Sequence, residues 1–115
     1  MVSNVKLAVI DIGMGNIRSI ENSLNYLSFK YKIINQPKKL EKYTHLILPG
    51  VGSYKKAMNM LNKTKFTNSI KLLVRQKKIK ILGICLGMQL LGSSSNEGGY
   101  TKGLSLIKNK TVKFS

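Results

Sequence analysis

The stretch that decides the fold reads Lys80-Ile81-Leu82-Gly83-Ile84-Cys85-Leu86-Gly87-Met88-Gln89. An apolar run of strand length stops at Gly-x-Cys-x-Gly, and an amphipathic segment follows it. Glycine two places on either side of a nucleophile is typical of a strand-to-helix elbow, because the sharp turn strains its central residue and brings neighbouring chain close. The pattern therefore predicts that Cys85 stands at the tip of a parallel strand, presented as a nucleophile.

At such an elbow the backbone amide of Leu86 and the positive end of the next helix are both available to a thiolate or an oxyanion. The competing interpretation of Cys85 is a buried, inert thiol, which is the usual fate of a lone cysteine. Gln89 lies one helical turn after Cys85, so its amide either faces the same pocket or is simply exposed on the helix.

Strands and helices alternate through the rest of the chain. Short apolar runs predict strands at 5–10, 31–35, 45–48 and 79–84, the first of them buried on both faces, and apolar residues three and four apart predict helices at 17–27, 54–61 and 66–74. After the elbow we expect a helix over 88–94, a polar turn over 93–99 and two strands, 104–107 and 111–114, joined by a tight connection. This order predicts one α/β domain over residues 1–115, with a mainly parallel sheet and helices on both faces.

Ligands bind such sheets beyond the carboxyl ends of the strands, and three glycine-rich segments fall there. Gly13-Met14-Gly15-Asn16 is either a binding loop or only a tight turn, because it lacks the third glycine of a dinucleotide fingerprint. Pro49-Gly50-Val51-Gly52 is more informative, since two glycines around one residue allow backbone amides to be aimed at a substrate. Beside a cysteine elbow this segment suggests the second donor of an oxyanion hole, and hence acyl transfer.

The charge is strongly unbalanced, with 20 Lys and Arg against 4 Asp and Glu and a formal net charge of +16. Only Arg18 and Arg75 are arginine, the residue favoured for bidentate phosphate and base contacts. The lysines are scattered through every expected helix and loop. We therefore expect a solvated basic surface that does not bind nucleic acid, although it can attract phosphorylated metabolites or an acidic protein.

A single cysteine excludes a disulfide framework and a cysteine-rich metal site. No segment approaches the ~20 apolar residues of a membrane span, and the apolar run between Lys6 and Asp11 is too short for a signal peptide. We therefore expect a cytoplasmic protein that uses no metal, cofactor or membrane.

Four segments together resemble a known family: Asp11 to Asn16, Leu48 to Gly52, Leu82 to Leu91 and Glu97 to Leu104. They are similar to the N-terminal signatures of the glutamine amidotransferase subunits of imidazole glycerol phosphate synthase, which are class I glutamine amidotransferases of flavodoxin-like architecture. The elbow alone fits any class I glutamine amidotransferase and, loosely, peptidase-like cysteine hydrolases. The combination is more specific, and it covers nearly the whole chain.

The resemblance implies a glutaminase. Cys85 would attack the side-chain amide of glutamine and form a glutamyl thioester, and the ammonia would pass to a cyclase subunit with a β/α barrel that makes imidazole glycerol phosphate in histidine biosynthesis. The resemblance further implies roles for other residues: Leu86, Val51 and Gly52 as oxyanion donors, Gly50 and Gln89 as contacts to glutamine, and Gly13, Met14, Gly15 and Asn16 as neighbours of the cyclase.

The general base is left unassigned by this match. The family activates its cysteine with a histidine oriented by a glutamate, both in a later segment, whereas this chain stops at Ser115. We therefore expect a C-terminally truncated domain that is inactive alone. His45, the one histidine, begins the strand that leads to Pro49, which places it ~13 Å from the edge where Cys85 lies and makes it a poor base.

Three alternatives stay open. The chain can belong to a paralogous subunit that amidates a surface-sugar precursor, or it can be a catalytically incomplete remnant that serves as an interaction module. A peptidase-like cysteine hydrolase is disfavoured, because it leaves the Gly-Met-Gly-Asn and Pro-Gly-Val-Gly segments unexplained.

Overall fold

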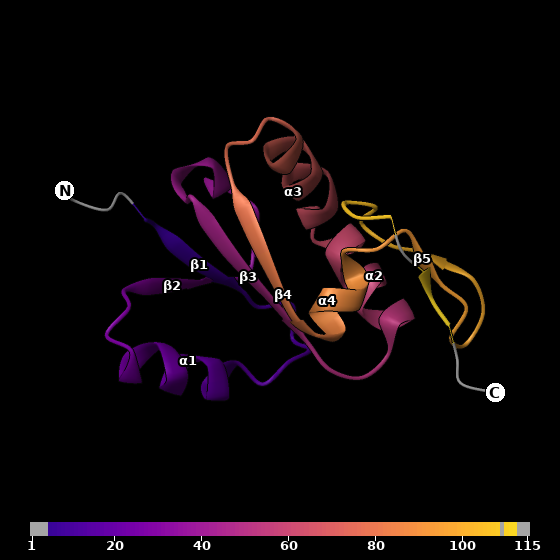
Figure 1. Ribbon diagram of the computed structural model, residues 1–115, viewed down its shortest axis with the longest axis horizontal. Coiled ribbons are helices and arrows are strands. Elements are labelled where there is room, and N and C mark those ends of the chain that lie inside the picture. The colour runs from indigo at the N-terminus through magenta and orange to yellow at the C-terminus, as the bar shows by residue number, and fades with distance from the viewer. Residues whose placement is uncertain (1–4, 109, 113–115) are drawn as a thin grey trace.

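Four parallel strands form the central sheet of the computed structural model, which describes residues 5–108 and 110–112. The strands are β1 (Leu7–Ile10), β2 (Tyr31–Ile34), β3 (His45–Gly50) and β4 (Lys80–Cys85), and they lie in the order β2-β1-β3-β4 (Figure 1). This is the order of the first strands of a flavodoxin-like sheet. The predicted fold class is confirmed.

Helices cover both faces of the sheet, as predicted. Figure 1 shows α1 (Ile17–Tyr26) on one side and α2 (Tyr54–Lys63) with α3 (Phe66–Arg75) on the other, and a 3-10 turn, η1 (Leu40–Lys42), precedes β3. Side-chain oxygens cap the first turns of α1 and α2. Asn16 Oδ1 accepts a hydrogen bond from the amide of Ser19 at 3.2 Å, at the start of α1. Ser53 Oγ accepts one from the amide of Lys56 at 3.3 Å, at the start of α2.

The alternation of side chains along the strands builds two cores. Val9 and Ile47 point to the α1 side and pack with Leu24. The opposite side holds the larger core, in which strand residues meet α2, α3 and the short helix after β4; its strand members include Ala8, Ile10, Leu46 and Leu48. Ala8, Val9 and Ile10 are fully buried, which confirms that the first strand is covered on both faces.

The helix after the elbow differs from its prediction. We expected it over 88–94, but α4 spans Leu86–Leu90 and the chain leaves it before Gly92. A glycine weakens a helix by ~1 kcal/mol. In addition, the carbonyl of Leu90 accepts a hydrogen bond from the amide of Leu104 at 2.9 Å, and that of Gly92 accepts one from the amide of Ser105 at 2.8 Å. A distant segment therefore ends the helix.

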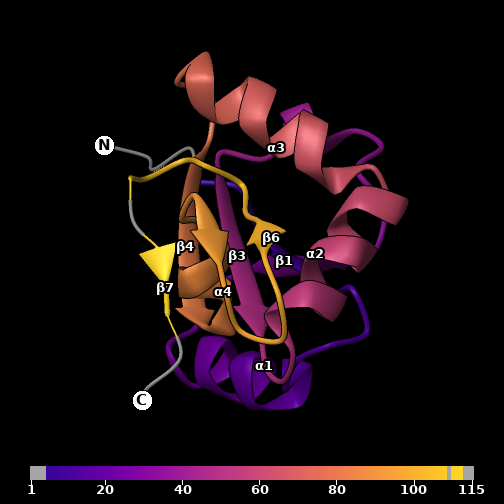
Figure 2. The same ribbon diagram turned by 90° about the vertical axis from the view of Figure 1, so that its right-hand side faces the viewer.

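The same contacts overturn the predicted strand at 104–107. The backbone amides of residues 104–107 donate hydrogen bonds to carbonyls at the end of α4 and just after it, so this segment does not pair with another strand. A small second sheet forms instead from β5 (Ser94–Ser95), β6 (Thr101–Lys102) and β7 (Lys110–Thr111), in the order β6-β5-β7, with β5 in part of the expected turn. Figure 2 shows it in front of α4. Because 104–107 is not a strand and β7 pairs in parallel with β5, the expected pair of strands joined by a tight connection is wrong. Residues 113 and 114 of the second expected strand lie outside the described ranges.

Candidate active site

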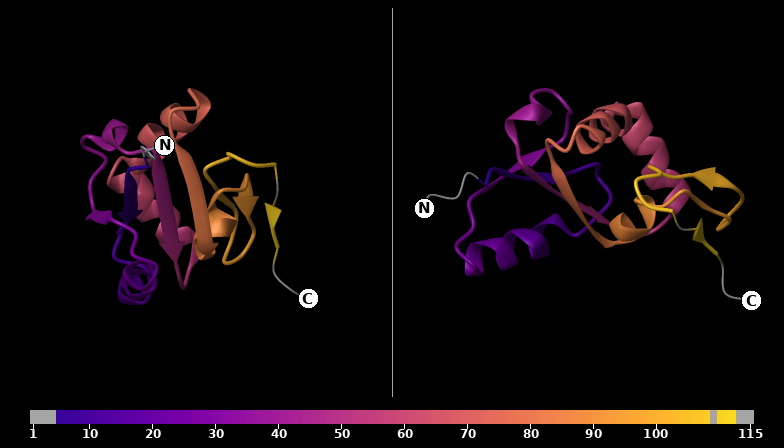
Figure 3. Two further views of the ribbon diagram at one scale, coloured as in Figure 1. Left: turned by 60° about the vertical axis from the view of Figure 1, so that its left-hand side comes forward. Right: turned by 45° about the horizontal axis from the view of Figure 1, so that its top comes forward.

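Cys85 is the last residue of β4 and directly precedes Leu86, the first residue of α4. Its backbone has φ 56° and ψ −122°, a conformation that is strained for any residue other than glycine, and its thiol is exposed. Figure 3 shows β4 running directly into α4 at this point. Strain of this kind persists only where the surroundings enforce it, as at a nucleophile elbow. The sequence pattern predicted this presentation of the thiol.

The two glycines that flank Cys85 allow the helix to fold back against the sheet. A Cβ at Gly83 would lie 2.6 Å from the carbonyl oxygen of Gly87, and one at Gly87 would overlap the carbonyl oxygen of Leu48. Both distances are shorter than packed atoms allow, and the obstructing atoms are backbone, which cannot rotate away. The Gly-x-Cys-x-Gly spacing is thus required by close approach of α4 to β3 and β4.

The segment Pro49 to Gly52 lies beside this elbow. Gly50 is opposite Cys85 in the β3–β4 register, and a Cβ on it would stand 3.1 Å from the Gly87 nitrogen and 3.2 Å from Leu86 Cβ. Val51 is half exposed, and Gly52 has φ +90°. The predicted oxyanion donors Val51, Gly52 and Leu86 are therefore on two segments that meet at the thiol.

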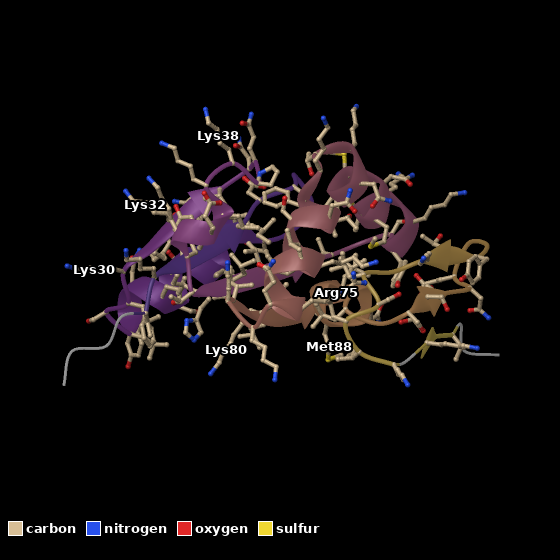
Figure 4. All side chains as sticks on the ribbon, turned by 90° about the horizontal axis from the view of Figure 1, so that it is seen from above. Lys30, Lys32, Lys38, Arg75, Lys80 and Met88 are labelled. Atoms are coloured by element: carbon tan, nitrogen blue, oxygen red, sulfur yellow. The ribbon has the colours of Figure 1, made fainter. Side chains whose placement is uncertain are left out.

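Gln89 lies on α4, partly buried, one turn beyond Cys85. The side of α4 that carries Leu86 and Leu90 is buried, whereas Met88 is 56 % exposed, and Figure 4 shows its side chain at the edge of the molecule. Gln89 is thus on a boundary position between core and solvent, where an amide can reach a ligand.

The loop 13–16 packs against the segment Pro49 to Gly52. The Met14 methyl lies 3.8 Å from where a Gly52 Cβ would be, and a Gly15 Cβ would be 3.5 Å from Pro49 Cβ. Asp11 Oδ1 accepts a hydrogen bond from the Gly13 amide at 2.9 Å, which shapes the turn. Met14 lies close to Gly52 because the two loops follow the neighbouring strands β1 and β3, a proximity that no local sequence pattern predicted.

His45 lies at the opposite end of the sheet. It is aligned with Lys80, whereas Cys85 is aligned with Gly50, five residues further along β3. At ~3.3 Å per residue this separation is ~17 Å. The His45 Nδ1 is instead 2.8 Å from Thr44 Oγ1. The expectation that His45 cannot serve Cys85 as a base agrees with this geometry.

Tyr54 is the first residue of α2, two residues after Gly52, and its hydroxyl has an environment that the sequence did not reveal. Its side chain is 1 % exposed, and its hydroxyl has no hydrogen-bond partner among the described residues. Burial raises the pKa of Tyr54, and the charge of Tyr100 adds to the effect. The helical spacing predicted a core position for Tyr54 but gave no sign of an unpartnered hydroxyl.

Lysine side chains project from the surface of several elements. Figure 4 shows Lys30, Lys32, Lys38 and Lys80 directed outward from several elements. Among residues 5–108 and 110–112, no three His, Cys, Asp or Glu side chains are grouped so that they could hold a metal ion, and no helix is long and apolar enough to cross a membrane.

The sheet order and the cysteine elbow are those of an amidotransferase, and the chain belongs to the class-I glutamine amidotransferase family, whose sequence pattern matches residues 8–113. A solved glutamine amidotransferase superposes with a TM-score of 0.81 over 93 % of this chain and 56 % of its own; at 18 % identity, this likeness concerns the fold alone.

Among individual proteins, the chain is similar to the imidazole glycerol phosphate synthase subunit HisH of Halalkalibacterium halodurans, with 49 % identity over 108 residues that make up 94 % of this chain and 50 % of that protein. It is likewise similar to subunit HisH 2 of Methanococcus maripaludis, with 47 % identity over 94 % of this chain and 53 % of that protein. The chain thus spans about half the length of the curated relatives it matches.

Proposed function

We propose that this chain carries the nucleophile and oxyanion segments of a glutaminase that supplies ammonia to a synthase of imidazole glycerol phosphate, in histidine biosynthesis. The observation that carries the proposal is the strained, exposed Cys85 at an elbow whose neighbour in register is Gly50. The names of the similar proteins favour imidazole glycerol phosphate over a surface-sugar precursor.

The chemistry begins with addition of the Cys85 thiolate to the side-chain amide carbon of glutamine. Negative charge then develops on the amide oxygen, where the backbone amides of Leu86, Val51 and Gly52 are available as donors. The carbon–nitrogen bond breaks as the nitrogen takes up a proton, which leaves ammonia and a glutamyl thioester. Water hydrolyses the thioester to glutamate and restores the thiol.

The proton transfers need a general base and acid close to the thiol, and the one histidine of the sequence lies elsewhere. A general base and acid contributes ~10² to 10⁴ in rate, and His45 is at the far end of the sheet. We therefore expect this chain alone to lack steady-state glutaminase activity and to gain it when the remainder of an amidotransferase domain is supplied.

The proposed partner is a cyclase with a β/α barrel that receives the ammonia. Its contact surface would include Gly13, Met14, Gly15 and Asn16, because this loop lies at the carboxyl edge of the sheet, where the thiol also is. The Met14 methyl lies close to Gly52, so a partner bound to this loop would adjoin the oxyanion segment. The Oδ1 atom of Asn16 is already engaged within the chain, because it accepts the hydrogen bond that caps α1.

The test is labelling with a glutamine-like chloroketone, followed by peptide mass analysis, on this chain joined to the unmatched half of the Halalkalibacterium halodurans relative. We expect modification at Cys85 that excess glutamine slows, and glutamate release that a Cys85→Ser variant loses. Labels spread over lysines, with Cys85 unmodified, would contradict the site. Equal turnover by residues 1–115 alone would contradict the missing base.

A further inference from the structure

Lysines that are scattered along the sequence gather in the fold around β2. This strand is at one edge of the described sheet, whereas β4, which ends in Cys85, is at the other. Figure 4 shows Lys30, Lys32 and Lys38 directed outward on the same side of the molecule. Two hollows lie there, one at each end of β2, and lysines line both of them.

The first hollow lies where β2 begins. It has a volume of about 380 Å³ and is formed by the start of β1, by residues 30–32 and by the residues that precede β3. The Tyr31 hydroxyl beside it donates a hydrogen bond to Glu21 Oε1 at 3.2 Å, but Glu21 itself does not line the hollow. Four lysines do: Lys6, Lys30, Lys32 and Lys42.

The second hollow lies beyond the other end of β2. It has a volume of about 620 Å³, and residues 35–38 face the junction between α2 and α3 across it. Asn35, Gln36, Thr64 and Ser69 supply hydrogen-bonding groups. Three lysines complete the charged part of the lining: Lys38, Lys63 and Lys65.

The two hollows together form a basic strip, defined by these seven lysines. Seven of the sixteen residues that line the hollows are lysine, against 18 of 115 in the chain, and none of the sixteen is Asp or Glu. Like charges held close together repel one another and destabilise the folded state. An anionic partner offsets this repulsion, so the strip is suited to bind one.

We propose that the basic strip docks an extended, acidic segment of another protein. The four residues of β2 span ~13 Å, so a segment of about six extended residues reaches from one hollow to the other. Each lysine is a point charge on a flexible stem, which matches single carboxylates spaced along a chain. A second copy of this chain is disfavoured as the partner, because each copy carries a formal charge of +16.

The lining favours a polypeptide over a nucleic acid. Neither arginine of the chain lines the strip, although arginine is the residue best shaped for phosphate. The two aromatic residues of the first hollow are partly buried: Tyr31 packs with the core on the α1 side and Tyr43 with the larger core. Neither is therefore a free platform on which a base could stack.

The test compares two triple variants that lower the formal net charge equally. The strip variant is Lys30→Gln with Lys32→Gln and Lys38→Gln, all exposed and drawn in Figure 4. The control variant is Lys55→Gln with Lys78→Gln and Lys102→Gln, which are also exposed but line neither hollow. Because β2 and Cys85 are at opposite edges of the sheet, the result does not depend on whether the chain belongs to a glutaminase.

The probe is a fluorescein-labelled peptide of eight glutamates, and its binding is followed by fluorescence anisotropy at pH 7 and physiological salt. At this salt, exposed charges more than about 8 Å apart are largely screened from each other. We expect saturable binding that weakens at least tenfold in the strip variant and stays within twofold in the control variant. A peptide of eight glutamines should not bind, and both variants should keep the far-ultraviolet circular dichroism of the native chain.

Four results would overturn the proposal. Equal weakening in both variants would assign the binding to overall charge, and absence of binding at physiological salt would remove the site. The third is displacement of the peptide by duplex DNA at lower concentration than by unlabelled peptide, which would assign the strip to nucleic acid. The fourth is equally effective displacement by pyrophosphate, which would assign it to a small anion.

Discussion

Replacing the glycines around the elbow by alanine one at a time should destabilise the protein in a graded order. A Cβ at Gly15 meets Pro49 Cβ at 3.5 Å, an ordinary contact, whereas one at Gly50 meets the Gly87 nitrogen at 3.1 Å. At Gly83 the new atom is 2.6 Å from the Gly87 oxygen and 2.7 Å from Met88 Cα, and at Gly87 it overlaps the Leu48 carbonyl. The clash grows from Gly15 through Gly50 to Gly83 and Gly87.

The magnitudes depend on how far backbone must move. Gly15→Ala needs no movement, so its effect should stay within about 0.5 kcal/mol. Gly50→Ala needs a few tenths of an ångström and should cost about 1 kcal/mol. Gly83→Ala and Gly87→Ala must displace α4 from the sheet, and we expect about 3 kcal/mol or more, at the upper end of overpacking. That is a large share of a total stability of ~5–15 kcal/mol.

The assay is urea unfolding followed by far-ultraviolet circular dichroism, with the free energy of unfolding extrapolated for each variant. Gly98→Ala is a second control, because Gly98 has φ +67° and no atom within 4 Å of its added Cβ, so it reports the conformational cost alone. If Gly83→Ala and Gly87→Ala unfold at the same urea concentration as Gly15→Ala, close packing of α4 on β3 and β4 is not what requires these glycines.

Other features give further predictions. Tyr54→Phe should raise the free energy of unfolding at pH 7 by about 1 kcal/mol, since it removes a buried hydroxyl that has no partner among the described residues. Burial raises the pKa of Tyr54 above its usual value of 10.0, so the folded state favours the protonated phenol. The free energy of unfolding of the native protein should therefore fall as pH rises above ~10, and it should fall less steeply in Tyr54→Phe. Urea titrations from pH 7 to 11 would show the difference. The dispersed lysines should bind duplex DNA weakly, with affinity that drops steeply as salt increases; a fluorescence titration that shows tight, sequence-dependent binding at physiological salt would refute this expectation.

The sequence alone determined the order of strands and helices up to Cys85 and the position of the nucleophile elbow. These features are local: an apolar run with glycines at fixed offsets, or apolar residues three and four apart, favours the same structure in many surroundings. It also indicated that His45 is a poor base for Cys85, because strand geometry fixes the distance between the two ends of one strand.

Only the tertiary structure decided the path of the chain beyond the elbow. Residues 104–107 have the composition of a strand, but their amides are donated to the carbonyl end of α4, a choice that depends on segments brought together by the fold. The same holds for the alignment of Gly50 with Cys85, the position of Met14 close to Gly52 and the exposure of Leu82. Each of these is a pairing between distant segments, and local sequence patterns carry no information about which distant backbone will satisfy a donor or cover an apolar face.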